Sequence, residues 1–189
     1  MPKIVDHNLY RIELLSKSLP IFVSKGVASV SMRELSKELG VSTGTLYHYF
    51  PTKEALFSSM VKHLVTLDAE AIHKLSEDTT SIIDIMNFIS GKEMHFLNLI
   101  LLAIDVKRHL SDSRELQKLV DDSFLAYETA LNRFFQKETN GNGGKAFLAF
   151  FVGALFLKSK GDEDTSWIEF FEGLGYLGNL FSDQAKNID

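Results

Sequence analysis

Short polar and aromatic side chains follow one another in one stretch of this chain: Thr43, Gly44, Thr45, Tyr47 and His48. Hydroxyl groups, a phenol and an imidazole can hydrogen-bond to DNA base edges and phosphates, and a glycine lets the backbone come close. The chemistry that suits this set is recognition of double-stranded DNA. Such recognition requires that the residues share the exposed face of a short helix.

The neighbouring residues predict the helix-turn-helix that would present this face. Ser31 and Glu34 have the spacing of a capping box, so a first short helix begins there. Gly40 allows a sharp turn, and Ser42 or Thr43 caps a second short helix. A pair of helices of this length can place its second member in a major groove. An ordinary helical hairpin is the alternative, but it does not explain the polar residues beside the aromatic ones.

The segment from Ser31 to Leu56 resembles the DNA-binding segment of TetR-type transcriptional repressors. The resemblance rests on the string Gly-Val-Ser-x-Gly-Thr-Leu-Tyr-x-Tyr-Phe-x-x-Lys-Glu-x-Leu and covers roughly residues 6–64. Two positions depart from the family pattern. Ser36 stands where alanine is usual, and Pro20 is unusual within the first helix, which we expect it to kink or to end early.

This resemblance implies a set of DNA-contacting positions. Lys53 corresponds to a family lysine that holds a phosphate at the start of the fourth helix, where unpaired backbone N–H groups add to the attraction. For Tyr49, a place in the core and a phosphate contact both stay open. The implied DNA-binding residues are Arg33, Ser42, Thr43, Gly44, Thr45, Tyr47, His48, Tyr49 and Lys53.

Hydrophobic spacing predicts an all-α chain, because apolar residues recur every three or four positions and no stretch alternates as a strand does. We expect an N-terminal three-helix helix-turn-helix domain over residues 1–52. A C-terminal helical bundle for ligand binding and dimerisation would span residues 53–189. The helix from residue 53 to about residue 75 would connect them, with an inner stripe of Leu56, Met60, Leu64, Leu67, Ala71 and Leu75.

Charge is divided unevenly along the chain. The net charge is −5, yet residues 1–62 carry eight Lys/Arg and five Asp/Glu, and the remaining residues carry 12 and 20. The N-terminal part is therefore mildly basic, as suits a DNA-binding domain. Because the excess is small, we expect weak and strongly salt-dependent non-specific binding.

Several classes of function lack their sequence signals. The chain has no cysteine, its six histidines show no metal-ligand spacing, and no nucleophile elbow or phosphate-binding loop is present. We therefore expect no enzymatic activity, no cofactor and no metal. The apolar run from Ala146 to Leu157 is too short for a bilayer and no signal peptide is evident, so we expect a cytoplasmic protein without a membrane partner.

Helical faces also predict a ligand pocket and a dimer interface. A monomer would struggle to bury the aromatic residues of the last two helices, so we expect these helices to pair with their copies in a second chain. An ordinary core is the alternative for the pocket set, and an internal hydrogen bond is the alternative for its two histidines. The pocket candidates are Phe88, His95, Phe96, Asn98, His109, Phe124, Tyr127 and Phe147; the interface candidates are Phe150, Phe151, Trp167, Phe170, Phe171, Leu174, Leu177 and Gly178.

These features and the resemblance together predict a homodimeric transcriptional regulator. In this interpretation, a repressor leaves a palindromic operator when a small, largely apolar inducer binds. The alternative is a helix-turn-helix regulator without a small-molecule inducer, controlled by a protein partner or by its own abundance.

Overall fold

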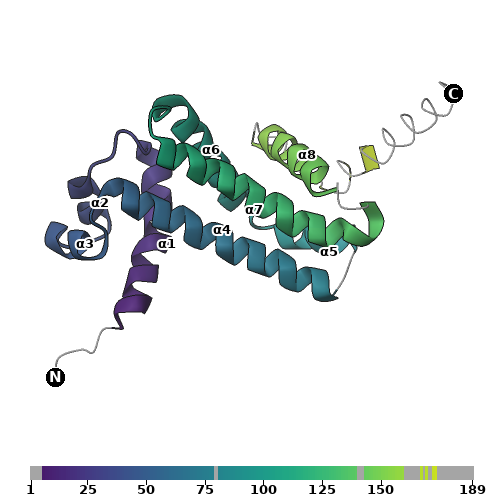
Figure 1. The fold of residues 1–189 in the computed structure, drawn as a ribbon, viewed down its shortest axis with the longest axis horizontal. Helices are drawn as coiled ribbons and strands as arrows, with labels where there is room; N and C mark the ends of the chain where they lie inside the picture. Colours follow the sequence, from purple (N-terminus) through teal and green to yellow (C-terminus); the bar gives the residue numbers. More distant parts are fainter. Residues whose placement is uncertain are drawn as a thin grey trace, which may run out of the picture.

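The computed structural model describes residues 6–78, 81–139, 143–159, 167, 169, 172 and 173. All regular structure in this part of the chain is helical, which confirms the predicted all-α fold. Helices α1 to α3 form a head at one end of the molecule, and α4 leads from it into a bundle (Figure 1). The helices are α1 (His7–Lys25), α2 (Met32–Glu38), α3 (Thr43–Tyr49), α4 (Lys53–Asp78), α5 (Ile82–Ile89), α6 (Glu93–His109), α7 (Arg114–Thr139) and α8 (Gly143–Lys158).

Helix α1 begins and ends at clear local signals. The Asp6 carboxylate caps its first turn by accepting two backbone N–H groups, and Gly26 ends it with a positive φ of 80°. The expectation that Pro20 ends this helix early is wrong, because α1 continues to Lys25. Pro20 and Ser16, whose carbonyl loses its usual partner, are both exposed, so water can hydrate that carbonyl.

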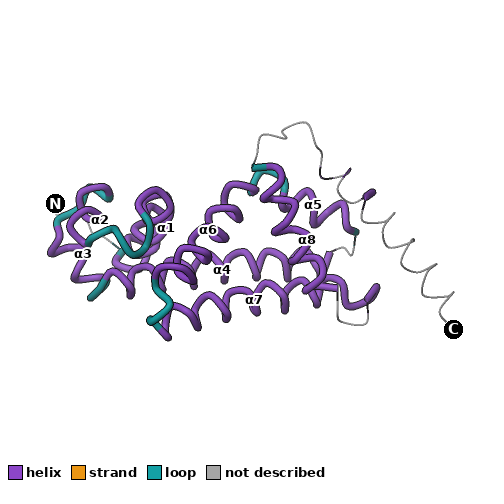
Figure 2. Tube along the Cα trace, turned by 90° about the horizontal axis from the view of Figure 1, so that it is seen from above, coloured by secondary structure: helices purple, strands orange, loops and turns teal. Residues whose placement is uncertain are grey.

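The bundle is built on α4 and α7, two helices of 26 residues that lie side by side in both views (Figures 1 and 2). Helix α8 packs on α7, and α5 lies at the end of α4 that is far from the head (Figure 2). Helix α6 contacts α1, α7 and α8, so it connects the head with the bundle.

The buried face of α4 differs from the predicted stripe. Phe57, Val61, Val65, Asp68 and Ile72 are buried along α4. The predicted residue Leu67 is 50% exposed, whereas Leu56 and Met60 near the head are buried as expected. The predicted stripe and the observed buried residues both recur with a helical period of 3.6 residues. The contacts of α4 with α7 and α5 decide which of the two sets is buried. One consequence is that an acidic residue occupies a core position.

Two hydrophobic clusters form the core of the described residues. The first joins the head to the bundle, since it contains Phe22 of α1, Leu46 of α3, Phe57 of α4 and Val106 of α6. The second lies toward the far end of the bundle and is rich in phenylalanine. Because the first cluster continues across residues 52 and 53, the proposed domain boundary there stays a prediction.

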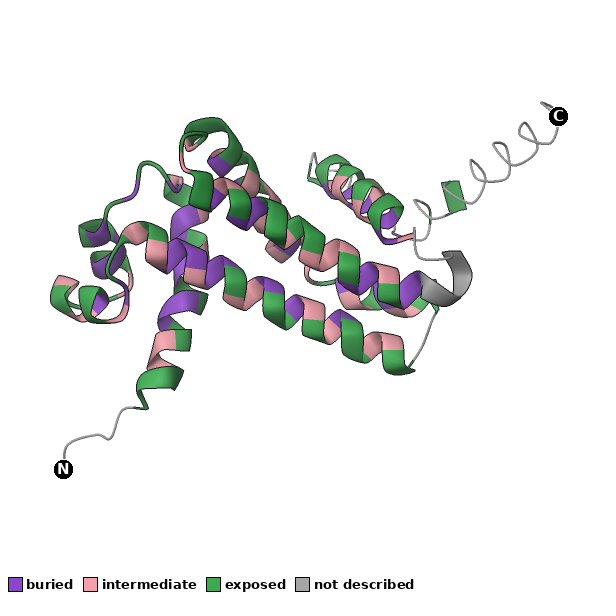
Figure 3. Cartoon of the chain, in the orientation of Figure 1, coloured by how far each residue is buried: buried purple, intermediate pink, exposed green. Residues whose placement is uncertain are grey.

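The outward faces of the helices are mostly exposed (Figure 3). Helix α6 also has an exposed apolar face, since Leu101 and Ile104 are 46% and 48% exposed. Among the described helices, none is both long and apolar enough to cross a bilayer.

A close approach between α7 and α8 depends on Gly144. Its backbone N–H donates to Asn132 Oδ1 at 2.8 Å. A Cβ at this position would lie 2.6 Å from both the Asn132 nitrogen and the Glu128 carbonyl oxygen. These are backbone atoms of another helix, so they cannot move aside as a flexible side chain can. Glycine is therefore required where α8 begins to pack on α7.

Gly144→Ala should lower the free energy of unfolding by about 1–3 kcal/mol, because the added methyl group forces the two helices apart. Urea denaturation at fixed protein concentration measures the change. Gly153→Ala is the matched control: a Cβ there meets nothing within 4 Å, and alanine should stabilise the helix by about 1 kcal/mol. Equal effects of the two substitutions would contradict the packing argument.

Candidate nucleic-acid interface and ligand cavity

The first helix of the helix-turn-helix starts at the predicted capping box. The Glu34 N–H donates to Ser31 Oγ at 3.3 Å, and the Ser31 N–H donates to Glu34 Oε2 at 2.9 Å. The hydrogen bonds from the Ser31 side chain and backbone lower the pKa of Glu34, so its carboxylate stays ionised near neutral pH. Gly40 then turns the chain with a φ of 70°, which a glycine adopts without strain.

Helix α3 is held against α2 by a small set of contacts. Ser42 caps α3 by accepting the Thr45 N–H at 2.9 Å. The hydroxyls of Ser36 and Thr43 lie 3.0 Å apart and join α2 to α3. Leu46 faces the core and is fully buried. The opposite face of α3 therefore points outward at the tip of the head (Figure 1).

The predicted DNA-binding residues divide into two groups on this surface. Arg33, Tyr47 and His48 are exposed, and Tyr47 retains 50% of its surface. Within the described residues, the side chains of Arg33 and Tyr47 make no hydrogen bond, so both can turn toward a groove. The hydroxyls of Ser42, Thr43 and Thr45 already take part in the capping and α2–α3 bonds, whereas Gly44 is exposed with no side chain.

The start of α1 adds residues that the sequence analysis missed. His7 Nδ1 and the Tyr49 hydroxyl form a hydrogen bond of 2.8 Å. The His7 ring also lies 6.3 Å from the His48 ring, and Tyr10 packs on Tyr49 at 5.6 Å. Tyr49 is thus half-buried against α1, and His7 lies beside the recognition helix. Because 42 residues separate His7 from Tyr49, no local pattern could reveal their contact.

Lys53 begins α4 and donates from Nζ to the Ala28 carbonyl oxygen at 2.9 Å. An ammonium group has three hydrogens, so this bond leaves two for a phosphate oxygen. Arg11 anchors the same region: it donates to Ser59 Oγ at 3.0 Å, and its guanidinium lies over the Phe50 ring at 5.0 Å. These bonds fix α1 and the end of α3 on the first turns of α4.

The bundle also holds the loop between α1 and α2 directly. Asp105 of α6 accepts the Val27 N–H through Oδ2 at 2.7 Å. Its Oδ1 bonds His109 Nδ1 at 2.8 Å, which places the exposed His109 side chain at this joint. A shift of α6 would therefore move the segment that leads into the helix-turn-helix.

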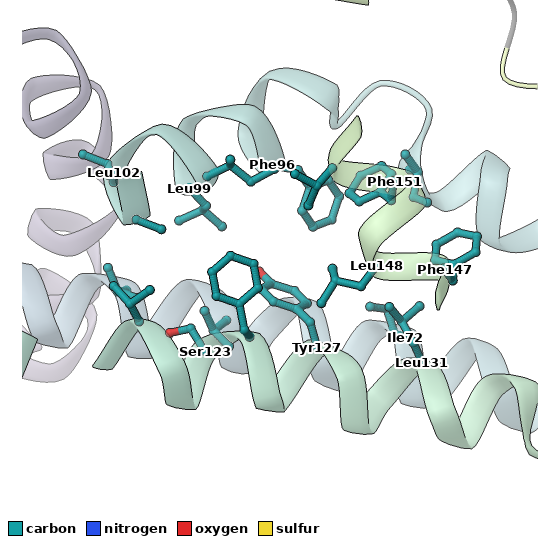
Figure 4. Close-up of a pocket in the computed structure, with 18 of the residues that line it drawn as sticks. Ile72, Phe96, Leu99, Leu102, Ser123, Tyr127, Leu131, Phe147, Leu148 and Phe151 are labelled. Atoms are coloured by element: carbon teal, nitrogen blue, oxygen red, sulfur yellow. The ribbon is translucent and has the colours of Figure 1, made fainter. Parts of the chain in front are cut away.

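A cavity of about 80 Å³ lies within the bundle, between α6 on one side and α4 and α7 on the other (Figure 4). Its walls come from both hydrophobic clusters: Phe57 and Leu102 belong to the first, and Phe96 and Phe147 belong to the second. The cavity therefore lies where the two clusters meet. Five predicted pocket residues line it: Phe88, Phe96, Phe124, Tyr127 and Phe147.

The other three pocket candidates are not among the lining residues. His109 lies at the Asp105 joint instead, and Asn98 is half-buried elsewhere on α6. His95 bonds Asp68 of α4 through Nε2 at 2.7 Å. An internal hydrogen bond, the alternative for these two histidines, therefore describes His95, whereas His109 is exposed and bonds Asp105 one turn away on α6. Helical faces alone could not separate a lining residue from one that packs a neighbouring helix.

A buried carboxylate lies behind the cavity wall. Asp68 is 5% exposed, and its Oδ2 accepts the Tyr127 hydroxyl at 2.7 Å in addition to its bond with His95. Burial first, and the Asp68 carboxylate second, raise the pKa of Tyr127 above its ordinary value. Tyr127 therefore stays protonated and keeps donating to Asp68. This cluster ties α4, α6 and α7 together beside the cavity.

The described interface candidates lie mainly inside their own chain. Phe151 is 6% exposed and lines the cavity, and its ring lies 5.5 Å from that of Trp167. Trp167 is 7% exposed and donates from Nε1 to Glu93 at 3.0 Å. Burial of these two residues thus needs no second chain, and Phe150 is half-buried. The candidates outside the described residues are Phe170, Phe171, Leu174, Leu177 and Gly178.

Comparison with known proteins matches this geometry at two levels. Residues 14–60 match the family model described as bacterial regulatory proteins, tetR family. The HTH-type transcriptional regulator PksA of Bacillus subtilis is 34% identical over 62 residues, which cover 33% of this chain and 30% of PksA. The alignment therefore covers less than a third of PksA. Its 62 residues are about as many as the head and the start of α4 contain together.

Two solved structures share the fold over most of both chains. Reduced NemR of Escherichia coli superposes with a TM-score of 0.68 at 18% identity, covering 89% of this chain and 96% of NemR. FadR of Bacillus subtilis, in complex with stearoyl-CoA, superposes with a TM-score of 0.62 at 16% identity, covering 82% and 89%. At these identities the likeness concerns the fold alone.

Tyr127→Phe should lower the free energy of unfolding by about 1–3 kcal/mol, because it removes one donor from a buried carboxylate. Tyr49→Phe deletes a hydroxyl from an exposed bond of similar length and should change stability by less than about 0.5 kcal/mol. Urea denaturation compares the two variants. If both lose the same stability, Asp68 does not depend on the Tyr127 hydroxyl.

Proposed function

We propose that this chain is a TetR-family protein and acts as a sequence-specific DNA-binding regulator of transcription in the cytoplasm, since residues 14–60 match that family's model. It works as a homodimeric repressor that leaves a palindromic operator when a small, largely apolar ligand binds. It carries out no catalysis and has no membrane partner. The observation that carries the proposal is the exposed face of α3, which lies at the tip of a head that packs on the helical bundle.

The exposed face of α3 supports binding in a major groove. Tyr47 and His48 provide a phenol and an imidazole for base edges, and Gly44 lets the backbone come close. Arg33 on α2 and Lys53 on α4 flank this face with positive charge and suit the phosphates on either side. The N–H groups at the start of α4 add to the attraction at Lys53.

A palindromic operator follows from two-fold symmetry. Two heads related by such an axis read half-sites about 34–36 Å apart, or a multiple of that distance. Helix α8 supports pairing of the subunits, because Phe156 and Leu157 are 59% and 51% exposed on it. Apolar side chains exposed to this extent on one helix end are typical of a surface that a second subunit covers.

The cavity supports a ligand-responsive form of the regulator. An engineered cavity that holds one benzene ring measures about 150 Å³, and this one measures about 80 Å³. A ligand with a ring therefore enters only if the wall moves apart. Phe57 and Leu102 of that wall also belong to the cluster that holds the head. A ligand that prefers the expanded wall thus shifts the head, with a coupling of about 1–3 kcal/mol.

FadR of Bacillus subtilis, which shares the fold, was solved in complex with stearoyl-CoA, so a ligand-binding protein of this fold is known. The alternative for the present protein is a regulator without a small-molecule inducer, controlled by a protein partner or by its abundance. The cavity supports the ligand-responsive form over this alternative, because a regulator without an inducer has no need of one.

DNA binding can be tested with a duplex that the wild-type protein enriches from a random pool. Tyr47→Ala should weaken binding about tenfold or more, since it removes a base-reading side chain. Lys53→Ala should weaken binding to all duplexes and reduce the slope of log affinity against log salt by about one unit. Fluorescence anisotropy over a salt series measures both effects.

The matched controls for these variants lie on α4, away from the head. Leu67 is as exposed as Tyr47, and Lys74 is an exposed lysine, so Leu67→Ala and Lys74→Ala should leave affinity and salt slope unchanged. Thermal melting checks that each variant folds. Unchanged DNA affinity in a folded Tyr47→Ala variant would refute the assignment of α3 as the reading helix.

The dimer can be tested by sedimentation velocity at micromolar concentration. The wild-type chain should sediment as a dimer, and Phe156→Glu combined with Leu157→Glu should shift it toward monomer, because charges would be buried at the interface. Ile83→Glu is the control, on an α5 residue that is 63% exposed. A monomeric wild type would contradict the proposed interface.

A further inference from the structure

We propose that Asp68 makes the cavity selective by charge, so that it admits uncharged or cationic apolar molecules and rejects carboxylates. This inference rests on the proposed ligand site and names the chemical class of its ligand. It starts from an unusual feature of the core: an acidic side chain occupies a buried position of α4 that carries apolar residues on either side, Val65 and Ile72.

The Asp68 carboxylate is hydrogen-bonded at a single oxygen. One carboxylate oxygen takes two hydrogen bonds of 2.7 Å, from the Tyr127 hydroxyl and with His95 Nε2. Two donors on one oxygen compensate a carboxylate for the loss of water. The side chain is 7% exposed, so solvent screens its charge little.

Tyr127 links Asp68 to the cavity. Its side chain lies among the lining residues (Figure 4), and its hydroxyl donates to Asp68, so the carboxylate is one hydrogen bond away from the lining. The lining around it is apolar, apart from Ser123 and Tyr127. Because charges interact strongly across an apolar medium, a ligand in the cavity experiences the field of Asp68.

The wall provides nothing that would compensate an anion. The described lining residues include no Lys, Arg or His. Their two hydroxyls are already donating: Ser123 to the Leu119 carbonyl at 2.7 Å, and Tyr127 to Asp68. A carboxylate entering the cavity would lose its water and meet only hydroxyl oxygens and a second carboxylate.

Two basic side chains approach the wall from outside. His95 pairs with Asp68, and Lys92 lies over the Phe88 ring at 4.1 Å from its centroid. Neither lines the cavity, so neither places a donor where a ligand could use it.

We call this selectivity for uncharged or cationic molecules over carboxylates the charge filter. Three planar molecules of the same shape test the filter: nitrobenzene is neutral, benzoate is anionic and benzamidinium is cationic. All three require the same expansion of the cavity, so their affinity ratios report charge. Ligand-detected NMR on the full-length wild-type protein should give nitrobenzene the highest affinity. Benzamidinium should bind at least tenfold more tightly than benzoate.

Asp68→Asn removes the charge and keeps the shape. It should improve benzoate relative to nitrobenzene by tenfold or more, and Glu70→Gln, at an exposed acid of the same helix, should leave this ratio unchanged. If Asp68→Asn does not fold, the ratio of benzamidinium to benzoate in the wild type decides alone.

The outcomes separate the filter from the ligand site itself. Binding of benzoate as tight as that of benzamidinium, or an unchanged ratio in a folded Asp68→Asn variant, would overturn the filter while the ligand site stands. If a protein that still binds DNA takes up none of the three molecules, the ligand site fails, and the filter fails with it.

Discussion

The packing of α1 against both α4 and α6 is the contact on which the rest of the structure depends. Phe22 of α1 lies against Phe57 of α4 with ring centroids 5.2 Å apart, and both are fully buried. Val106 of α6 belongs to the same cluster. The head therefore has no core separate from that of the bundle. A displacement of α4 or α6 displaces the helix-turn-helix, because its inner face rests on them.

Apolar contact is not directional, so burial alone does not fix how the head is oriented on the bundle. Hydrogen bonds between the head and the bundle fix this orientation. Asp105 and Lys53 hold two neighbouring backbone groups of the loop between α1 and α2, the Val27 N–H and the Ala28 carbonyl. One of these anchors comes from α6 and the other from the start of α4. The orientation of the head thus depends on the relative position of α4 and α6, two of the helices that line the cavity.

Local signals in the sequence predicted much of the head. The capping box at Ser31, the turn at Gly40 and the cap at Ser42 act within a few residues, so spacing alone reveals them. The bundle was less accessible to such reasoning. Two neighbouring stripes of residues on α4 are equally periodic. Only the packing of α4 against other helices determines that Asp68 is buried and that Leu67 is exposed. His95 likewise bonds Asp68 of α4, a partner that periodicity cannot identify, whereas Asp105 and His109 lie four residues apart on α6, a spacing that is visible in the sequence.

In the proposed regulator, a ligand would act by moving the cavity wall rather than by filling a fixed space. The cavity measures about 80 Å³, less than the roughly 150 Å³ that holds one benzene ring, so a ligand with a ring would bind only an expanded wall. Its effect on the head would then depend on its preference for that expanded arrangement, typically about 1–3 kcal/mol. The cavity lies between the cluster that holds the head and the cluster that closes the far end of the bundle. Expansion of the wall would therefore act on the packing that sets the head's orientation, and under the proposed charge selectivity the carboxylate behind Tyr127 would select the molecules that cause it.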